Sequence, residues 1–379
     1  LSVAYYGDCK RPATITTAAE RTAFERETLA RIRALDSTPM GYGQYDLTEY
    51  VSGEKARFTA NADYWRAQPS TGFFEIQVVP MGREVDAVLD GTVDIVRAYS
   101  TIKVVDSVYK SGFVSIYSWM GDVVGYLGMQ ASCPLFTDLR VRQALAMGID
   151  RQQVVTNTLE RYGTLPGMLL FDSFAETSDV LGEKDPLDRI RANALLDEAG
   201  WTRGTDGVRV KDGQRFAFTF VATKENPVTE AMAAGLQLCA TQLGLEIKME
   251  WVPFDELCRR VETGDCDMYF EARHLPTHPA LAADLFVGES PLNHSGYTSE
   301  GMERFTNWAA REKDEARQSV IYEGMYQEMY LELPFIPIYR RADLLLVNGR
   351  VRNLYISSAH AITSDAYRFI IRDAKTDDE

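Results

Sequence analysis

One stretch of the sequence collects most of the side chains that could bind a charged ligand or a metal ion. It reads Glu271-Ala272-Arg273-His274-Leu275-Pro276-Thr277-His278-Pro279. His274 and His278 are four residues apart, but the two prolines prevent the regular helix that would place both imidazoles on one face. A metal site would also need a third ligand, for which Glu271 and His294 are candidates by count alone. We therefore expect a loop that lines a binding site, without a metal and without a cofactor.

The sequence offers no motif for catalysis. It contains no G-x-S-x-G turn, no P-loop, no dinucleotide-binding glycine string and no H-E-x-x-H. Carboxylates are plentiful, so a glycosidase-like pair stays open, but nothing singles one out. A net charge of −15 argues against nucleic acid and against anionic membrane surfaces as partners. We predict no catalytic residues and a chain that is not an enzyme.

The elements that must position the candidate stretch form two β-α-β patterns. The first has strands at 73–80 and 93–96 around a helix at 83–89, and a hairpin strand at 46–50 precedes it. The second has strands at 216–220, 246–252 and 267–270, with helices after Asn226 and Asp255. Each pattern predicts a parallel sheet with helices packed on it. We also expect a surface helix at 17–35 and a further helix that starts at Asp185-Pro186 and ends at Gly200.

Between the two patterns lies a long apolar strand, 114–129, which carries Tyr117 and Trp119. Two helices follow it, and Asp138 and Asp150 are placed to cap them. Arg140 lies early in the first helix, where the helix dipole does not favour a positive charge. The same holds for its neighbour Arg142. We favour a solvated face over specific partners for both arginines.

The five cysteines form no C-x-x-C motif, and the odd count leaves at least one unpaired. Cys258 and Cys266 could form a bridge across a short connection. We favour buried free thiols.

The string around these two helices resembles the signature of the family-5 extracellular solute-binding proteins of ABC importers, the peptide- and nickel-binding group. It reads Tyr126-Leu127-Gly128-Met129-Gln130, then Pro134 to Asp138, Val141-Arg142-Gln143-Ala144-Leu145 and Ile149-Asp150-Arg151. Further matches are Asn61-x-Asp63-Tyr64-Trp65 and Pro334-Phe335-Ile336-Pro337-Ile338-Tyr339. The resemblance covers about residues 39–356.

The resemblance implies an α/β fold of the type II periplasmic-binding-protein kind, in which strands cross between two lobes. We expect residues 1–38 to be the remnant of an N-terminal extra lobe, 39–113 part of lobe I, 114–335 lobe II, and 336–379 the return to lobe I. Relative to the family's pattern, a large N-terminal segment is missing. We therefore expect a fragment or a shortened variant from which any signal peptide is already absent.

The resemblance further implies an extracytoplasmic protein, lipid-anchored when full length. It would bind a peptide or another small solute between its lobes and deliver it, as a monomer, to an ABC permease in the membrane. The alternatives are a hydrolase or a ligand-sensing receptor on the same two-lobed frame. The residues expected to line the ligand site are Tyr117, Trp119, Glu271, Arg273, His274 and Tyr339.

The sequence departs from the family's peptide binders at one position. Those proteins place an aspartate shortly before the proline that matches Pro279, where it pairs with the peptide ammonium, but here no acid lies between Arg273 and Pro279. A buried ammonium without a counter-charge is costly. Either Glu271 supplies that charge, or the ligand is not a free-amine peptide and Arg273 and His274 bind an anionic group.

Overall fold

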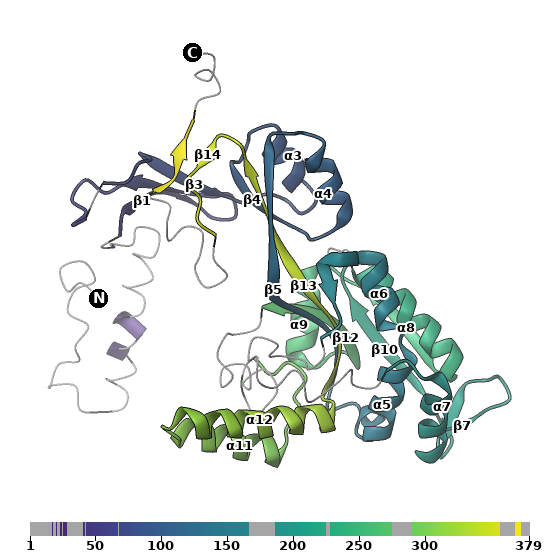
Figure 1. The fold of residues 1–379 in the computed structure, drawn as a ribbon. Coiled ribbons are helices and arrows are strands. Elements are labelled where there is room, and N and C mark those ends of the chain that lie inside the picture. Colours follow the sequence, from purple (N-terminus) through teal and green to yellow (C-terminus); the bar gives the residue numbers. More distant parts are fainter. Residues whose placement is uncertain are drawn as a thin grey trace. The chain divides into compact units, whose positions relative to one another are not determined.

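The computed structural model describes residues 17, 20, 23, 24, 26–28, 41, 43–66, 68–166, 186–224, 228–274, 290, 292–356 and 368–372 (Figure 1). Contacts divide the chain into two compact units. Unit 1 comprises Leu1–Ala98, Ser107–Tyr117 and Leu345–Glu379, and unit 2 comprises Tyr99–Asp106 and Ser118–Leu344. The junctions at 117/118 and 344/345 fall four and nine residues after the predicted lobe boundaries at 113/114 and 335/336, and Tyr99–Asp106 also belongs to unit 2. The division into lobes stays a prediction. Most of the predicted remnant 1–38 lies outside the described residues; within the predicted helix at 17–35, residues 20, 23, 24 and 26–28 are described and helical.

Unit 1 is built around a small antiparallel sheet. Its strands are β1 (Tyr45–Val51), β2 (Lys55–Ala60) and β3 (Phe73–Gln77), in the order β1-β2-β3. Phe58 lies opposite both Leu47 and Phe74, and it stacks on Phe74 with ring centroids 4.8 Å apart. Helix α3 (Glu84–Leu89) and strand β4 (Ile95–Ala98) follow, while β14 (Val351–Arg352) pairs with β15 (Ile370–Ile371). The predicted strands and the predicted helix of this region are confirmed to within a few residues. The predicted parallel sheet is wrong here, because β3 pairs antiparallel with β2 and β4 belongs to a different sheet.

Unit 2 contains a mixed sheet whose strands lie in the order β11-β10-β12-β5-β13. Strand β10 (Ala217–Ala222) is parallel to both β11 (Glu246–Trp251) and β12 (Met268–His274). Strand β5 (Val114–Met129) is antiparallel to β12 and occupies the residues predicted for the long strand. Both β5 and β13 (Phe335–Asn348) run from one unit into the other, and β6 (Gly163–Thr164) pairs with β13.

Helices cover both faces of this sheet (Figure 1). One face packs Phe218, Phe220 and Phe270 into a core with the helices α5 (Leu139–Gly148), α6 (Arg151–Thr158), α7 (Arg189–Glu198) and α8 (Thr229–Leu243). The other face packs Tyr126 and Tyr269 against α9 (Phe254–Thr263), α11 (Glu300–Arg311) and α12 (Glu315–Glu332). Unit 2 is therefore a three-layer α/β/α body, because helices connect the parallel strands of the mixed sheet and bury its faces.

Helix caps account for most of the predicted boundaries. Asp138 accepts a hydrogen bond from Arg140 N at 2.9 Å, and Asp150 accepts one from Gln153 N at 2.9 Å, so both predicted caps are confirmed. Helix α9 differs from its prediction. It begins at Phe254, directly after the extended Pro253, so Asp255 lies in its first turn and does not cap it.

Helix α7 also begins later than predicted. Its N-cap is Asp188, whose side chain accepts a hydrogen bond from Arg191 N at 2.9 Å. The sequence has two aspartates in reach, and the later one makes the cap.

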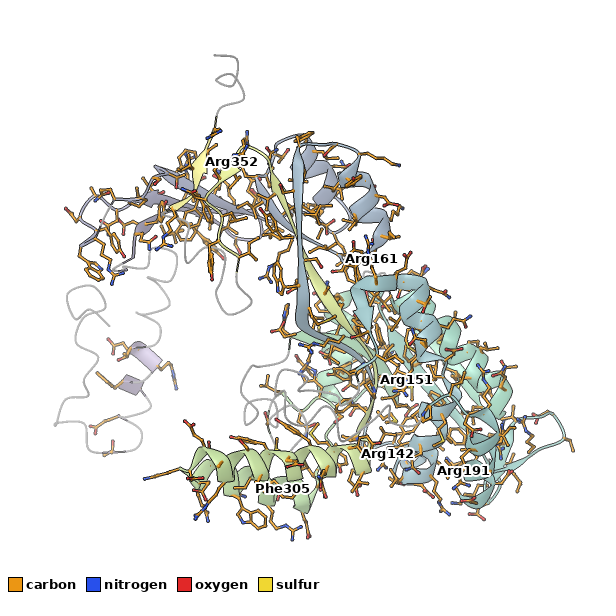
Figure 2. The ribbon with its side chains drawn as sticks, in the orientation of Figure 1. Arg142, Arg151, Arg161, Arg191, Phe305 and Arg352 are labelled. Carbon is orange, nitrogen blue, oxygen red and sulfur yellow. The ribbon has the colours of Figure 1, made fainter. Side chains whose placement is uncertain are left out.

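The prediction of a solvated face is wrong for Arg142. Its side chain, labelled in Figure 2, is 9% exposed. The guanidinium donates to the main-chain oxygens of Phe136, Thr137, Glu332 and Leu333 at 2.6–3.2 Å. It thereby joins the start of α5 to the end of α12. Arg140 is exposed and pairs with Asp138 at 2.7 Å.

Four cysteines lie within the described residues, and all four are free: Cys133, Cys239, Cys258 and Cys266. The preference for free thiols is confirmed for them, and the predicted burial holds for Cys133 and Cys239, while Cys258 and Cys266 are half-buried. Burial raises the pKa of Cys239 to about 12 and that of Cys133 to about 11, so neither is a ready nucleophile. In the described part of the chain, none of the helices combines the length and the apolar character of a membrane span.

Candidate functional site

The candidate site lies at one edge of the unit 2 sheet. Strands β10, β11 and β12 run in the same direction, so their carboxyl ends, at Ala222, Trp251 and His274, meet at this edge. Open α/β sheets bind their ligands at such an edge. Because β5 is antiparallel to β12, the early residues of its unit 2 part lie here too, and Val123 is directly opposite His274.

Strand geometry separates the three predicted residues of β12. Side chains alternate between the two faces of a strand, so Glu271 and Arg273 share one face while His274 belongs to the other. The face of Glu271 is the one on which Tyr126 and Tyr269 pack with α9, α11 and α12. The structure thus brings Glu271 and Arg273 together and sets His274 apart.

Glu271 and Arg273 form a closed network. Arg273 Nε donates to Glu271 Oε1 at 2.5 Å, and the Tyr126 hydroxyl donates to Glu271 Oε2 at 2.8 Å. The other guanidinium nitrogens of Arg273 contact Leu292 O at 3.0 Å and the ring of His294, with Nε2 at 2.7 Å. The side chains of Glu271, Arg273 and His294 are only 20%, 14% and 14% exposed.

The charges in this network hold each other in place. Burial alone would raise the pKa of Glu271, but the adjacent His294 and the positive charge of Arg273 outweigh it and lower that pKa below its ordinary value. Burial opposes the charge of Arg273, yet the neighbouring Tyr126 and Glu271 raise its pKa. Burial and the Glu271 carboxylate raise the pKa of Tyr126, which therefore stays a neutral donor. Both charges of β12 are compensated inside the protein.

His274 is instead an open residue. Its Nδ1 lies 2.8 Å from Asp122 Oδ1 on β5, and the two side chains are 60% and 46% exposed. Trp119 is half-buried three residues before Asp122 on the same strand, and Met120 between them is exposed. This part of the edge offers a carboxylate, an imidazole and an indole to solvent.

The edge also carries residues that the sequence reasoning missed. Lys224 follows β10 and places its Nζ 5.5 Å from the ring of Trp251, the last residue of β11, which is exposed. Asp122 was missed as well. Their signal was topological. Lys224 and Trp251 lie just beyond and at the ends of parallel strands, and Asp122 lies within β5 next to Val123, which is opposite the end of β12. Only the strand order reveals these positions.

The two predicted tyrosines lie elsewhere. Tyr339 has no exposed surface, and a Cβ on Gly125 would come within 2.3 Å of its ring, so it fills the space above that glycine. Here it is a core side chain without surface open to a ligand. Tyr117 is exposed and belongs to unit 1. The predicted groove between the lobes stays a prediction.

Within the described ranges, no group of three or more His, Cys, Asp or Glu side chains is arranged to hold a metal ion. His278 lies outside these ranges.

Comparison with known proteins identifies relatives that match most of the chain. A family model of the bacterial extracellular solute-binding proteins, family 5 (middle part), matches residues 10–283, more than half of the chain. The chain is 27% identical over 312 residues to the oligopeptide-binding protein AppA of Bacillus subtilis, covering 79% of this chain and 56% of AppA. It is 28% identical over 297 residues to protein XP55 of Streptomyces lividans, covering 74% and 50%. The chain spans about half the length of these curated relatives.

Solved structures share the fold. The oligopeptide-binding protein AppA from B. subtilis in complex with a nonapeptide aligns with a TM-score of 0.75 and 22% identity, covering 87% of this chain and 66% of that one. Lactococcal OppA, complexed with an endogenous peptide in the closed conformation, gives 0.80 and 18%, covering 90% and 67%. NikZ from Campylobacter jejuni in complex with Ni(L-His) gives 0.79 and 19%, covering 89% and 69%. The predicted type II periplasmic-binding-protein fold is confirmed. With the family match, it follows that this chain belongs to the bacterial extracellular solute-binding proteins of family 5.

Proposed function

We propose that the chain is the extracytoplasmic solute-binding component of an ABC importer, which captures a peptide or another small solute and delivers it to a membrane permease. The match of residues 10–283 to the family carries this proposal. Relatives with the same fold include proteins named for oligopeptides and one solved with Ni(L-His). The protein would act as a monomer, lipid-anchored when full length, and would perform no chemistry on its ligand.

We assign the ligand contacts to the edge formed by β5 and β12. Trp119 would stack on an apolar or planar part of the solute, and His274 with Asp122 would hydrogen-bond to a polar group. The exposure of this pair supports the assignment, since both side chains can exchange water for ligand. Tyr117 stays a predicted contact from unit 1. Glu271 and Arg273 would act indirectly, because their network anchors the strand that carries His274.

The proposed mechanism is closure of the two lobes about the strands that connect them. Strands β5 and β13 both pass from one unit into the other, so a change in their backbone angles would move the units as bodies. A ligand that contacts both lobes binds the closed state better and shifts the population toward it.

Native mass spectrometry of the full-length protein, purified without refolding, tests the function. We expect a small solute to co-purify intact, and its affinity can then be measured on variants. Trp119→Ala and His274→Gln should each weaken binding at least about tenfold, the loss of one good contact. Trp308→Ala, which removes an exposed tryptophan from α11, is the matched control.

Each contrary result has a separate meaning. Unchanged affinity in both edge variants would contradict the site but leave the function standing. A bound molecule that is cleaved during incubation would favour the hydrolase alternative. Binding without any loss of solute uptake in cells that lack the gene would favour the receptor.

A further inference from the structure

The unit 2 sheet ends, within the described part of the chain, in a regular strand that pairs on one side only. This strand is β11, which pairs with β10 from Glu246 to Trp251 without a break. Strand β1, at an edge of the small sheet in unit 1, is instead interrupted by a register shift between Leu47 and Glu49. Such bulges blunt an edge against further pairing, and the described length of β11 has none.

The backbone of β11 directs alternate residues toward this open edge. Glu246 N donates to Phe216 O at 2.9 Å, so the even-numbered residues of the strand turn their backbone groups toward β10. The odd-numbered residues turn theirs away from β10 because the direction alternates along a strand. Within the described ranges, no hydrogen bond satisfies the N–H groups of these residues, which are Ile247, Met249 and Trp251. A row of unpaired backbone groups is a template for another strand.

The side chains of β11 restrict which strand fits. Ile247 and Met249 lie on one face and pack against the core under α8. The other face carries Lys248, whose side chain is 74% exposed, and Glu250. Charged side chains on an edge keep most strands away. Lys248 and Glu250 have opposite signs and lie two residues apart, so they match a strand that presents the same two charges in reverse order. An antiparallel copy of β11 does so.

We propose that β11 pairs with β11 of a second copy of this chain, antiparallel and centred on Met249. In this register Met249 lies opposite itself, and Ile247 lies opposite Trp251 of the other copy. Each of these pairs joins outward-facing residues, which exchange two N–H···O bonds. On the other face, Lys248 of each copy lies opposite Glu250 of the other, and opposite charges in such positions stabilise the pairing.

The charges also specify the register. Sliding one strand by two residues places Lys248 opposite Lys248 in one direction and Glu250 opposite Glu250 in the other, and like charges directly opposite each other destabilise a strand pair. A strand of six residues buries far less surface than a standard interface, so the pairing is weak and reversible. The monomer of the proposed function is then the dilute form, and the inference does not rest on that function.

Sedimentation velocity of the intact chain over a series of protein concentrations tests the proposal. We expect a reversible equilibrium between monomer and dimer. Lys248→Glu should weaken the dimer at least about tenfold, because it places acidic side chains opposite each other, and Glu250→Lys should do the same with basic ones. An equal mixture of the two variants should restore the dimer, since each charge then faces its opposite. Lys313→Glu, at an exposed position between α11 and α12, changes the net charge equally and should leave the dimer unaltered.

Hydrogen exchange gives a second measurement that needs only the unmodified protein. This matters because Glu250→Lys also breaks the contact with Arg260 at 2.5 Å and could impair folding. The amides of Ile247, Met249 and Trp251 should exchange more slowly at high protein concentration than at low, whereas the amide of Lys248, which faces β10, should not change.

Two results would overturn the proposal. The first is a monomer at every concentration. The second is a dimer that Lys248→Glu leaves unchanged and that does not slow exchange at the outward-facing amides of β11. Neither result bears on solute capture, which native mass spectrometry measures separately.

Discussion

The polar side chains at the end of β12 differ in their surroundings although they are adjacent in sequence. Glu271 and Arg273 face a helical layer, where Tyr126 and His294 complete their hydrogen bonds. His274 comes next along the chain, at the end of the strand, and shares a solvent-exposed contact with Asp122. A single step along the strand therefore separates a charge that stabilises the fold from a side chain that is open to a ligand.

The comparison teaches which charges to assign to binding. A compensated buried charge stabilises the fold and has little left to offer a ligand, whereas an exposed pair can exchange its partner at small cost. If Glu271 bound the ammonium group of a peptide ligand, that group would have to compete with Arg273, Tyr126 and His294 for the same carboxylate. Among the described residues, the Asp122 carboxylate contacts only His274 in this way.

The largest expected effect comes from breaking the closed network. Glu271→Ala leaves Arg273 buried without its counter-charge and Tyr126 without its acceptor, and it should cost about 3–5 kcal/mol of stability. Urea unfolding of the variant against the unmodified protein measures this. Glu198→Ala removes an exposed carboxylate from its pair with Arg191 and should cost under about 0.5 kcal/mol. Equal effects of the two changes would refute the distinction between the pairs.

A smaller effect tests how tightly the same face is packed. A Cβ on Gly128 would lie 2.1 Å from the ring of Tyr269, directly across from it on β12. Gly128→Ala should therefore push Tyr269 off its position and cost about 1–3 kcal/mol. Gly53→Ala, at a turn with nothing within 4 Å, provides a comparison in which only backbone strain acts, since its φ is +76°. Thermal melting of both variants would show whether the crowding exceeds the strain.

The contribution of this network to stability should depend on pH. The pKa of Glu271 is lower in the folded protein than its ordinary value of 4.5. Its contribution is therefore complete above about pH 4.5 and is lost as the pH falls through the lower folded-state pKa. The difference in melting temperature between the unmodified protein and Glu271→Gln should shrink as the pH is lowered from about 7 to about 3. A constant difference across this range would contradict the assignment.

The smallest effect on stability belongs to the open pair. His274→Gln replaces an exposed side chain and should change the free energy of unfolding by less than about 0.5 kcal/mol, as should Asp122→Asn. Circular dichroism during urea unfolding checks both. A loss as large as that of Glu271→Ala would mean that the exposed pair is also structural, and the comparison would fail.

Local sequence signals predicted much of the scaffold. The caps at Asp138 and Asp150, the strand at 216–220, and the long strand at 114–129 all follow from interactions between residues close in sequence. The boundary at Asp255 was wrong because the neighbouring Pro253 also favours a helix start. Such competition between adjacent signals depends on small energy differences that a pattern does not resolve.

The sequence by itself determined the fold class. Hydrophobic periodicity and capping act within a few residues, and the family's motifs are short stretches of sequence. Only the tertiary structure decided the partners of the charges. Arg142 donates to a carbonyl of α12 almost 200 residues away. Arg273 contacts His294, and Asp122 on β5 contacts His274 on the neighbouring β12. Whether a charge is buried and compensated or open to a ligand depends on which distant elements pack beside it, and strand order and helix packing set that.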